Sequence, residues 1–109
     1  MTDKRIVLTT AGSEDEARKI AYHLVENRLA ACVNLIPRVE SIYRWQGKIE
    51  TADEWLLLIK TTVKKFPAVR DAIGELHSYE VPECIMLPIE EGSASYLQWL
   101  GDAVEEPKR

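Results

Sequence analysis

The fold class that the sequence predicts is α+β, in a single domain that spans residues 1–109. Apolar runs typical of strands alternate with segments of helical spacing in the order β-α-β-β-α-β, and a further helix follows. One stretch, residues 30–61, is predicted to form a single extended hairpin. A length of 109 residues suits one domain with its own core. This order is that of the split β-α-β, ferredoxin-like fold with an extended central hairpin and an added C-terminal helix.

The chain is predicted to begin with a strand and a helix. Residues 5–10 are rich in β-branched and apolar side chains. Ser13 and Glu16 then have the spacing of a capping box, which marks a helix start. Acidic residues in this first turn suit the positive end of the helix dipole, which is a simpler role than a cation site. Apolar side chains at helical spacing extend the helix to about residue 27.

The predicted hairpin at residues 30–61 has two arms of a dozen or more residues, whereas strands usually have roughly 5–6. Gly47 supplies the positive φ that a tight reversal needs. A hairpin of this length must project beyond a small domain. Its outer half carries Tyr43 and Trp45, so we expect these aromatic side chains to need cover from elsewhere.

The second half is predicted to contain two more helices and one more strand. Pro67 suits the first turn of a helix that continues at helical spacing to Leu76. Residues 77–83 form a polar connector, and residues 84–89 a fourth strand. Ser93 can cap a third helix. The tail, residues 105–109, is predicted to be frayed.

The predicted strands are apolar on both faces, although the two helices between them can cover only one face of the sheet. A strand with one face in water should alternate apolar and polar residues, and these strands do not. Burial of apolar surface contributes about 25 cal/mol per Å². We therefore expect a homo-oligomer in which copies of the chain cover the second face. The alternative is that the third helix covers this face within one chain.

Composition excludes several classes of partner. A net charge of −4 and a pI of about 5.2 argue against nucleic acid and against anionic membrane surfaces. No apolar run approaches the roughly 20 residues of a membrane span, and the first residues lack the apolar segment of a signal peptide. We expect a cytoplasmic protein, with Cys32 and Cys84 reduced rather than joined in a disulfide.

Two motifs together resemble the CutA family of divalent-cation tolerance proteins. They are the tyrosine-x-tryptophan-x-glycine tip at residues 43–47 and the Tyr-Glu-Val-Pro-Glu connector at residues 79–83. Further segments that carry the resemblance are residues 28–34, 41–49, 59–61 and 96–100, with Glu54. The resemblance runs nearly end to end.

The resemblance implies a ferredoxin-like homotrimer whose sheets pack around a central axis, with an architecture similar to the PII signalling proteins. It also implies a cytoplasmic role in tolerance to copper and other divalent ions, copper binding in some members, and no established enzymatic activity. One departure concerns the copper ligands proposed for some members, a cysteine near the end of the first strand and two adjacent histidines. Thr9 and Leu76 stand at two of these positions here. Copper or another divalent cation is therefore expected to bind with low affinity, and no organic cofactor is predicted.

The connector holds the densest set of candidate metal ligands. His77, Glu80 and Glu83 offer imidazole and carboxylate groups, with Tyr79 and Cys84 beside them. Their spacing matches no established metal motif. The alternative is that His77 only ends the second helix, where a cationic imidazole meets the negative end of the dipole.

A second candidate site is a cleft between subunits. It would be lined by Tyr43, Trp45, Lys60, Tyr79 and Glu83. Lys60 ends an apolar run, where its charge needs a partner, and we predict a partly buried ion pair with Glu83. The alternative is an interface that only packs.

Three function classes follow. The first is a homotrimer that binds a divalent metal ion weakly, or a small regulator in the cleft, and acts in metal tolerance. The second is a structural or PII-like signalling trimer that binds protein partners. The third, a small-molecule enzyme, lacks a base placed beside a nucleophile, so the protein is predicted not to be an enzyme.

Overall fold

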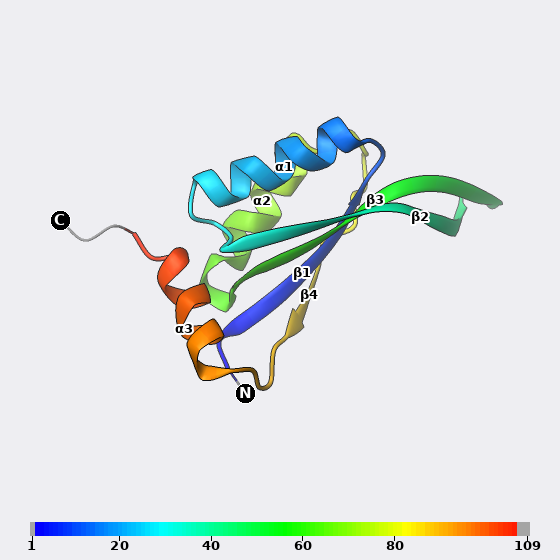
Figure 1. Cartoon of the computed structure of the whole chain (residues 1–109). Helices are drawn as coiled ribbons and strands as arrows, with labels where there is room; N and C mark the ends of the chain where they lie inside the picture. The colour runs from blue at the N-terminus through cyan, green and yellow to red at the C-terminus, as the bar shows by residue number, and fades with distance from the viewer. Residues whose placement is uncertain (1, 107–109) are drawn as a thin grey trace.

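The chain forms a four-stranded antiparallel sheet in the order β2-β3-β1-β4, with helices α1 and α2 packed on one face (Figure 1). The computed structural model describes residues 2–106. The elements are β1 Lys4–Ala11, α1 Glu14–Glu26, β2 Cys32–Trp45, β3 Lys48–Thr62, a 3₁₀ turn Val63–Lys65, α2 Phe66–Leu76, β4 Ile85–Pro88 and α3 Ala94–Ala103. The predicted α+β class and the order of its elements are confirmed. The predicted frayed tail lies partly in residues 107–109, outside the described residues.

The helix α1 begins at the predicted cap, but only half of the capping box forms. The Ser13 hydroxyl accepts a hydrogen bond from the Glu16 N–H at 3.2 Å. The Glu16 carboxylate does not reach back to Ser13. Its Oε1 instead accepts a hydrogen bond from the Ser78 N–H at 3.0 Å, which ties the start of α1 to the connector after α2.

The core lies between the sheet and the two helices. Because side chains alternate along a strand, Val7 in β1 and Leu57 and Ile59 in β3 all point to the helix face, where they are fully buried. Ile20 of α1 and Ile73 of α2 meet them there. Cys32 and Cys84 are half-buried and free.

The hairpin of β2 and β3 extends well beyond the helices, as predicted (Figure 1). It makes the molecule 50 Å long and only 28 Å by 22 Å across. Trp45 pairs with Lys48, and the two turn residues Gln46 and Gly47 have φ values of 49° and 80°. Two positive φ values are typical of a type I′ turn, whose twist matches that of the strands.

A β-bulge interrupts β2 between Ile36 and Val39. Ile36 pairs with Leu56 and Val39 with Glu54, so β2 has one residue more than β3 across this step. Arg38 within the bulge has a φ of 61°, a left-handed conformation that is unusual for a residue with a side chain. Beyond the bulge, each side chain of β2 therefore points to the face opposite to the one that it would occupy without the extra residue.

The second face of the sheet is only partly covered within one chain. Helix α3 lies over the end of this face farthest from the hairpin tip, where the Lys60 Nζ is 5.9 Å from the centroid of the Tyr96 ring (Figure 1). Beyond α3, Ile85 and Leu87 of β4 remain 49% and 45% exposed. The alternative in which the third helix covers this face therefore holds for one end only. None of the helices within residues 2–106 is both long and apolar enough to cross a membrane.

Candidate functional site

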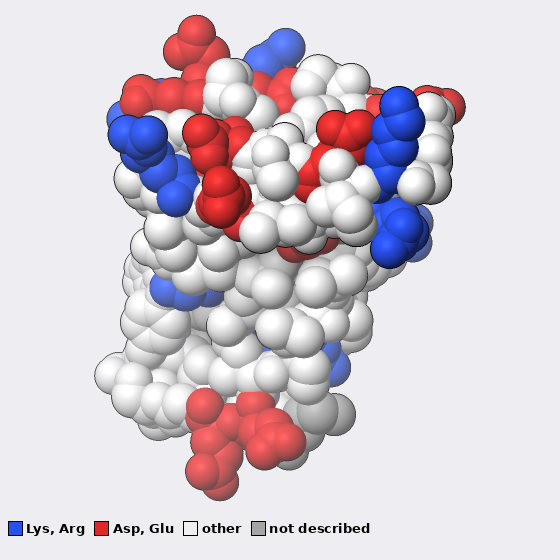
Figure 2. All heavy atoms as spheres, turned by 90° about the vertical axis from the view of Figure 1, so that its right-hand side faces the viewer, with Lys and Arg blue, Asp and Glu red and all other residues white. Residues whose placement is uncertain are grey.

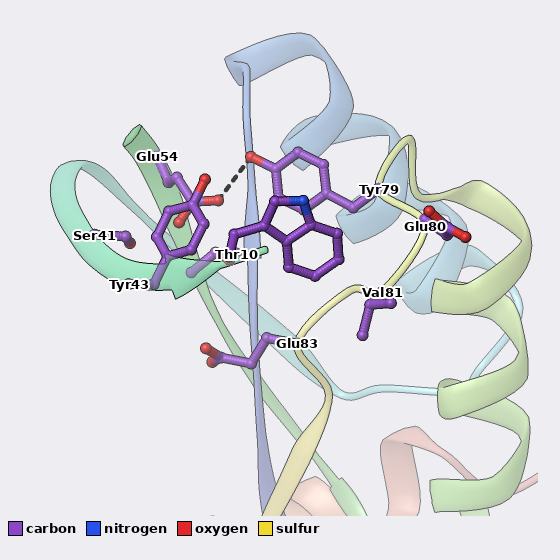
Figure 3. Close-up of a pocket in the computed structure, with 9 residues that line it drawn as sticks. Thr10, Ser41, Tyr43, Glu54, Tyr79, Glu80, Val81 and Glu83 are labelled. Carbon is purple, nitrogen blue, oxygen red and sulfur yellow. Dashed lines mark hydrogen bonds between the residues drawn. The ribbon is translucent and has the colours of Figure 1, made fainter. Parts of the chain in front are cut away.

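A pocket of about 360 Å³ lies between the outer half of the hairpin and the connector that follows α2 (Figure 3). Its walls come from β1, β2, β3 and the connector. The lining residues are Thr10, Ser41, Tyr43, Trp45, Glu54, Tyr79, Glu80, Val81 and Glu83. Four of the five residues predicted to line a cleft thus come together within one chain, namely Tyr43, Trp45, Tyr79 and Glu83.

The β-bulge in β2 places the aromatic wall of this pocket. Val39 and Glu54 are paired across the ladder, so they share one face, and alternation puts Tyr43 and Trp45 on that same face. If the pairing of Ile36 with Leu56 continued without the bulge, both aromatic side chains would point to the opposite face. The extra residue in β2 therefore brings the aromatic rings to the side of Glu54.

Glu54 and Tyr79 form the inner end of the pocket. The Tyr79 O–H donates a hydrogen bond of 2.7 Å to Glu54 Oε2 (Figure 3). Burial, and then the hydrogen bond and the negative charge of Glu54, raise the pKa of Tyr79 well above its ordinary value of 10.0. Tyr79 is therefore a neutral donor at physiological pH. A side chain at Gly12 would place a Cβ 3.1 Å from the Tyr79 hydroxyl, so Gly12 leaves the space that this ring occupies.

His77 fixes the connector against β1. Its side chain is fully buried, Nε2 lies 2.5 Å from the carbonyl oxygen of Thr10, and Nδ1 lies 3.0 Å from the N–H of Tyr79. A carbonyl can only accept and an N–H can only donate, so the ring is the neutral tautomer with its proton on Nε2. Both nitrogens are thus engaged by the backbone, and the role of His77 is to position Tyr79.

The predicted metal ligands are not assembled within one chain. Both ring nitrogens of His77 are hydrogen-bonded to backbone groups. The exposed side chains of Glu80 and Glu83 line the pocket, but His77 does not. Residues 2–106 contain no group of three or more histidine, cysteine, aspartate or glutamate side chains that could hold a metal ion. At the two departure positions, Thr9 is buried on the helix face and Leu76 packs against the core.

Lys60 does not join Glu83 within the chain. Lys60 pairs across the ladder with Ile6, whereas Glu83 precedes β4, whose first residue Ile85 pairs with Leu8. The lysine therefore lies farther toward the α3 end of the sheet, where its ammonium group is near the Tyr96 ring. The predicted ion pair is absent from the single chain, and whether copies form it stays a prediction.

Sequence reasoning missed Glu54, Thr10 and Ser41 as lining residues. Ser41 could have been found, because residues 41, 43 and 45 are spaced by two along one strand and therefore share a face of the sheet. Glu54 carried one signal, a carboxylate directly before a run of five apolar residues. Its burial to 6% exposure, however, depends on the bulge and on Tyr79, which lie far apart in the sequence.

Acidic side chains gather around the hairpin end of the molecule. Figure 2, which faces this end, shows them over the upper part of the surface, with lysine and arginine toward the margins. No lysine or arginine within residues 2–106 lines the pocket itself. In Figure 3 the carboxylate of Glu83 points toward the side of Tyr43 and Glu54, and Glu80 lies at the opposite edge.

Comparisons with known proteins agree on one family. The family described as CutA1 divalent ion tolerance protein matches residues 5–103. The divalent-cation tolerance protein CutA of Thermus thermophilus is 53% identical over 97 residues, which cover 89% of this chain and 94% of that protein. The human protein CutA is 50% identical over 96 residues, and the match covers 88% of this chain but only 54% of the human protein.

Solved structures have the same architecture. The Thermus thermophilus Cut A1 structure has a TM-score of 0.90 and 51% identity, with coverage of 92% of this chain and 97% of that chain. The CutA structure from Xylella fastidiosa has a TM-score of 0.93 and 38% identity, with coverage of 95% and 100%.

Proposed function

Because the chain belongs to the family of CutA1 divalent ion tolerance proteins, we propose that it acts in tolerance to divalent metal ions as a cytoplasmic, non-catalytic binding protein. In this proposal it assembles as a homotrimer of ferredoxin-like subunits. The pocket between hairpin and connector is its binding site. Relatives are named as tolerance proteins, which fits a role in binding rather than in catalysis.

The observation that carries this proposal is the composition of the pocket. Three carboxylates and three aromatic rings surround about 360 Å³, a volume in the range of small-molecule sites. The connector that supplies Tyr79 and Glu83 is held in place by buried hydrogen bonds of His77. Such a preformed pocket favours a bound ligand over an interface that only packs.

Assembly as a trimer is supported by the half-exposed apolar face of the sheet. Ile85, Leu87 and Ile36 form an apolar surface beyond the reach of α3. Two further copies would bury these surfaces together and would add walls to the open mouth of the pocket. An ion pair of Lys60 with Glu83 of a neighbouring copy remains part of this proposal.

A divalent cation would bind weakly at this site. The groups that face the pocket are the carboxylates of Glu54, Glu80 and Glu83, which are hard oxygen ligands. High-affinity copper sites use imidazole and sulfur ligands, and the nitrogens of His77 are occupied by the backbone. The alternative ligand of the same pocket is a small regulator.

Calorimetric titration with Cu²⁺, Zn²⁺ and a panel of nucleotides tests this function. We expect Cu²⁺ or Zn²⁺ to bind in the pocket, with affinity lowered at least tenfold by Glu83→Gln, because the substitution removes one of the carboxylates that would coordinate the ion. Glu90→Gln, which changes an exposed carboxylate outside the pocket, is the matched control and should bind as the wild type does. Affinities that are equal in the two variants would place the ligand elsewhere.

One observation favours a second candidate function, a PII-like trimer that binds protein partners. Ile42 and Ile49 lie near the hairpin tip and are 67% and 61% exposed. Apolar side chains at the end of a projecting arm are typical of contact surfaces. Substitution of both by serine would weaken partner binding but leave ligand binding in the pocket unchanged.

A further inference from the structure

Glu54 is a buried carboxylate without a cationic partner among the described residues. It is 94% buried, since its residue is only 6% exposed, and no lysine, arginine or histidine of residues 2–106 forms an ion pair with it. Among residues 2–106, its side chain accepts one hydrogen bond, from the neutral hydroxyl of Tyr79 to Oε2. A buried carboxylate is costly unless a positive group pairs with it. The pocket therefore carries negative charge that no basic side chain of residues 2–106 offsets.

Aromatic rings surround the space that this charge would occupy. Trp45 and Tyr43 are 43% and 44% exposed and come from the hairpin, and Tyr79 comes from the connector. The faces of such rings attract ammonium and guanidinium groups, most strongly where water is excluded. Rings of this kind are not ligands for a bare metal ion, which needs oxygen, nitrogen or sulfur atoms.

The remaining lining residues make the site selective for charge. Within one chain, Glu80 and Glu83 add negative charge at the edges, and no basic side chain of residues 2–106 lines the pocket to receive a phosphate or carboxylate group. Anionic ligands such as nucleotides would thus meet repulsion. A volume of about 360 Å³ exceeds the needs of one metal ion and suits a small organic molecule.

We propose that this pocket binds a small organic cation, whose ammonium or guanidinium group lies between the Glu54 carboxylate and the rings of Trp45 and Tyr43. The inference rests on the proposed binding function and names the class of its ligand. Tyr79 holds Glu54 in place through its hydroxyl, and Glu83 adds charge at the mouth. The positive group of the ligand supplies the charge that the chain lacks at Glu54.

A pair of probes of equal shape tests the role of charge. Choline carries a quaternary ammonium group, and 3,3-dimethylbutan-1-ol is its neutral counterpart with carbon in place of nitrogen. We expect calorimetry on the full chain, in its native assembly, to give at least tenfold tighter binding of choline. Equal affinity for both probes would overturn the inference, because shape and apolar contact alone would then explain binding.

Matched variants locate the binding site. Glu54→Gln keeps an acceptor for the Tyr79 hydroxyl but removes the charge, and we expect it to weaken choline binding at least tenfold. Trp45→Leu should weaken it as well, and Glu90→Gln should leave it unchanged. Circular dichroism shows whether Glu54→Gln folds. If it does not, Glu83→Gln removes a different negative charge from the pocket and should weaken choline binding by a smaller factor. If none of the pocket variants changes the affinity for choline, the assignment of the binding site to this pocket is overturned.

Parallel titrations separate this inference from the function on which it rests. Binding of Cu²⁺ or Zn²⁺ that depends on Glu83, together with no binding of choline or guanidinium, overturns the organic cation and leaves the metal-binding proposal standing. Binding of a nucleotide in the pocket, with no binding of choline or guanidinium, also overturns the organic cation and leaves a small regulator as the ligand of the proposed function. A pocket that binds none of these probes overturns both proposals.

Discussion

At the scale of single residues, Tyr79 connects the parts of the site. Its backbone N–H binds His77, its hydroxyl binds Glu54, and its ring lies 4.6 Å from that of His77 and against Gly12. Three segments far apart in the sequence thus meet at one side chain. Substitutions at this position report on the whole pocket.

We predict that Tyr79→Phe lowers the free energy of unfolding by about 1–2 kcal/mol, because the buried Glu54 oxygen loses its donor. Urea denaturation measures the change. The double variant with Glu54→Leu should lose less than the sum of the two single variants, since the two changes remove one interaction. Additive losses would show that the hydrogen bond contributes nothing to stability.

A second prediction follows from the raised pKa of Tyr79. A group whose pKa is raised in the folded state contributes stability that is fully present below its ordinary value of 10.0 and declines as the pH rises above it. Urea midpoints of the wild type should therefore fall more steeply than those of Tyr79→Phe between about pH 9 and pH 11. Parallel pH profiles would contradict the assignment of this loss to Tyr79.

At the scale of elements, local patterns predicted most of the fold. The alternation of apolar runs with helical spacing identified all four strands and all three helices, because periodicity depends on neighbouring residues. The tip of the hairpin was also predictable from Gly47. These features need no knowledge of distant contacts.

The site was less predictable, because it depends on register. Tyr43 and Trp45 were predicted to line a cleft between subunits, and within one chain they line the same pocket, as their spacing of two along β2 allows. The bulge that turns them toward Glu54 requires a positive φ at Arg38, and an arginine gives no signal of that conformation. Lys60 was assigned to a cleft between subunits from its position at the end of an apolar run. Within one chain its pairing with Ile6 places it near α3, and its place in a cleft between copies stays a prediction.

The turn of the hairpin offers a stability test at this scale. Gln46 has a φ of 49°, which asparagine adopts more readily than glutamine, and Asn-Gly is the preferred sequence of a type I′ turn. We predict that Gln46→Asn raises the free energy of unfolding by about 0.5 kcal/mol. Gly47→Ala, at a φ of 80°, should lower it by about 1 kcal/mol, although no atom lies within 4 Å of the added methyl group. Thermal unfolding monitored by circular dichroism compares the two, and a stabilised Gly47→Ala variant would contradict the turn assignment.

At the scale of the whole molecule, the two faces of the sheet differ in what covers them. Helices α1 and α2 bury the central part of one face, where Val7, Leu57 and Ile59 are fully buried, and α3 covers only one end of the other face. The uncovered part lies between α3 and the projecting hairpin. A subunit of this shape offers a second copy both an apolar surface and an arm that can reach around it.

The proposed trimer can be tested by measuring the mass of the particle in solution. Analytical ultracentrifugation at micromolar concentration should find a particle of about three times 12.4 kDa. Leu87→Lys places a charge on the apolar part of the second face of the sheet that is exposed in one chain, on the edge strand β4, and should shift the mass to that of one chain, because an unpaired ammonium group is costly to bury in an apolar contact. Tyr22→Lys changes a residue that is 62% exposed on α1, which packs on the opposite face of the sheet, and should leave the assembly intact. A folded wild type that sediments as a single chain would contradict the assembly, and the pocket would then have to bind its ligand with the walls of one chain alone.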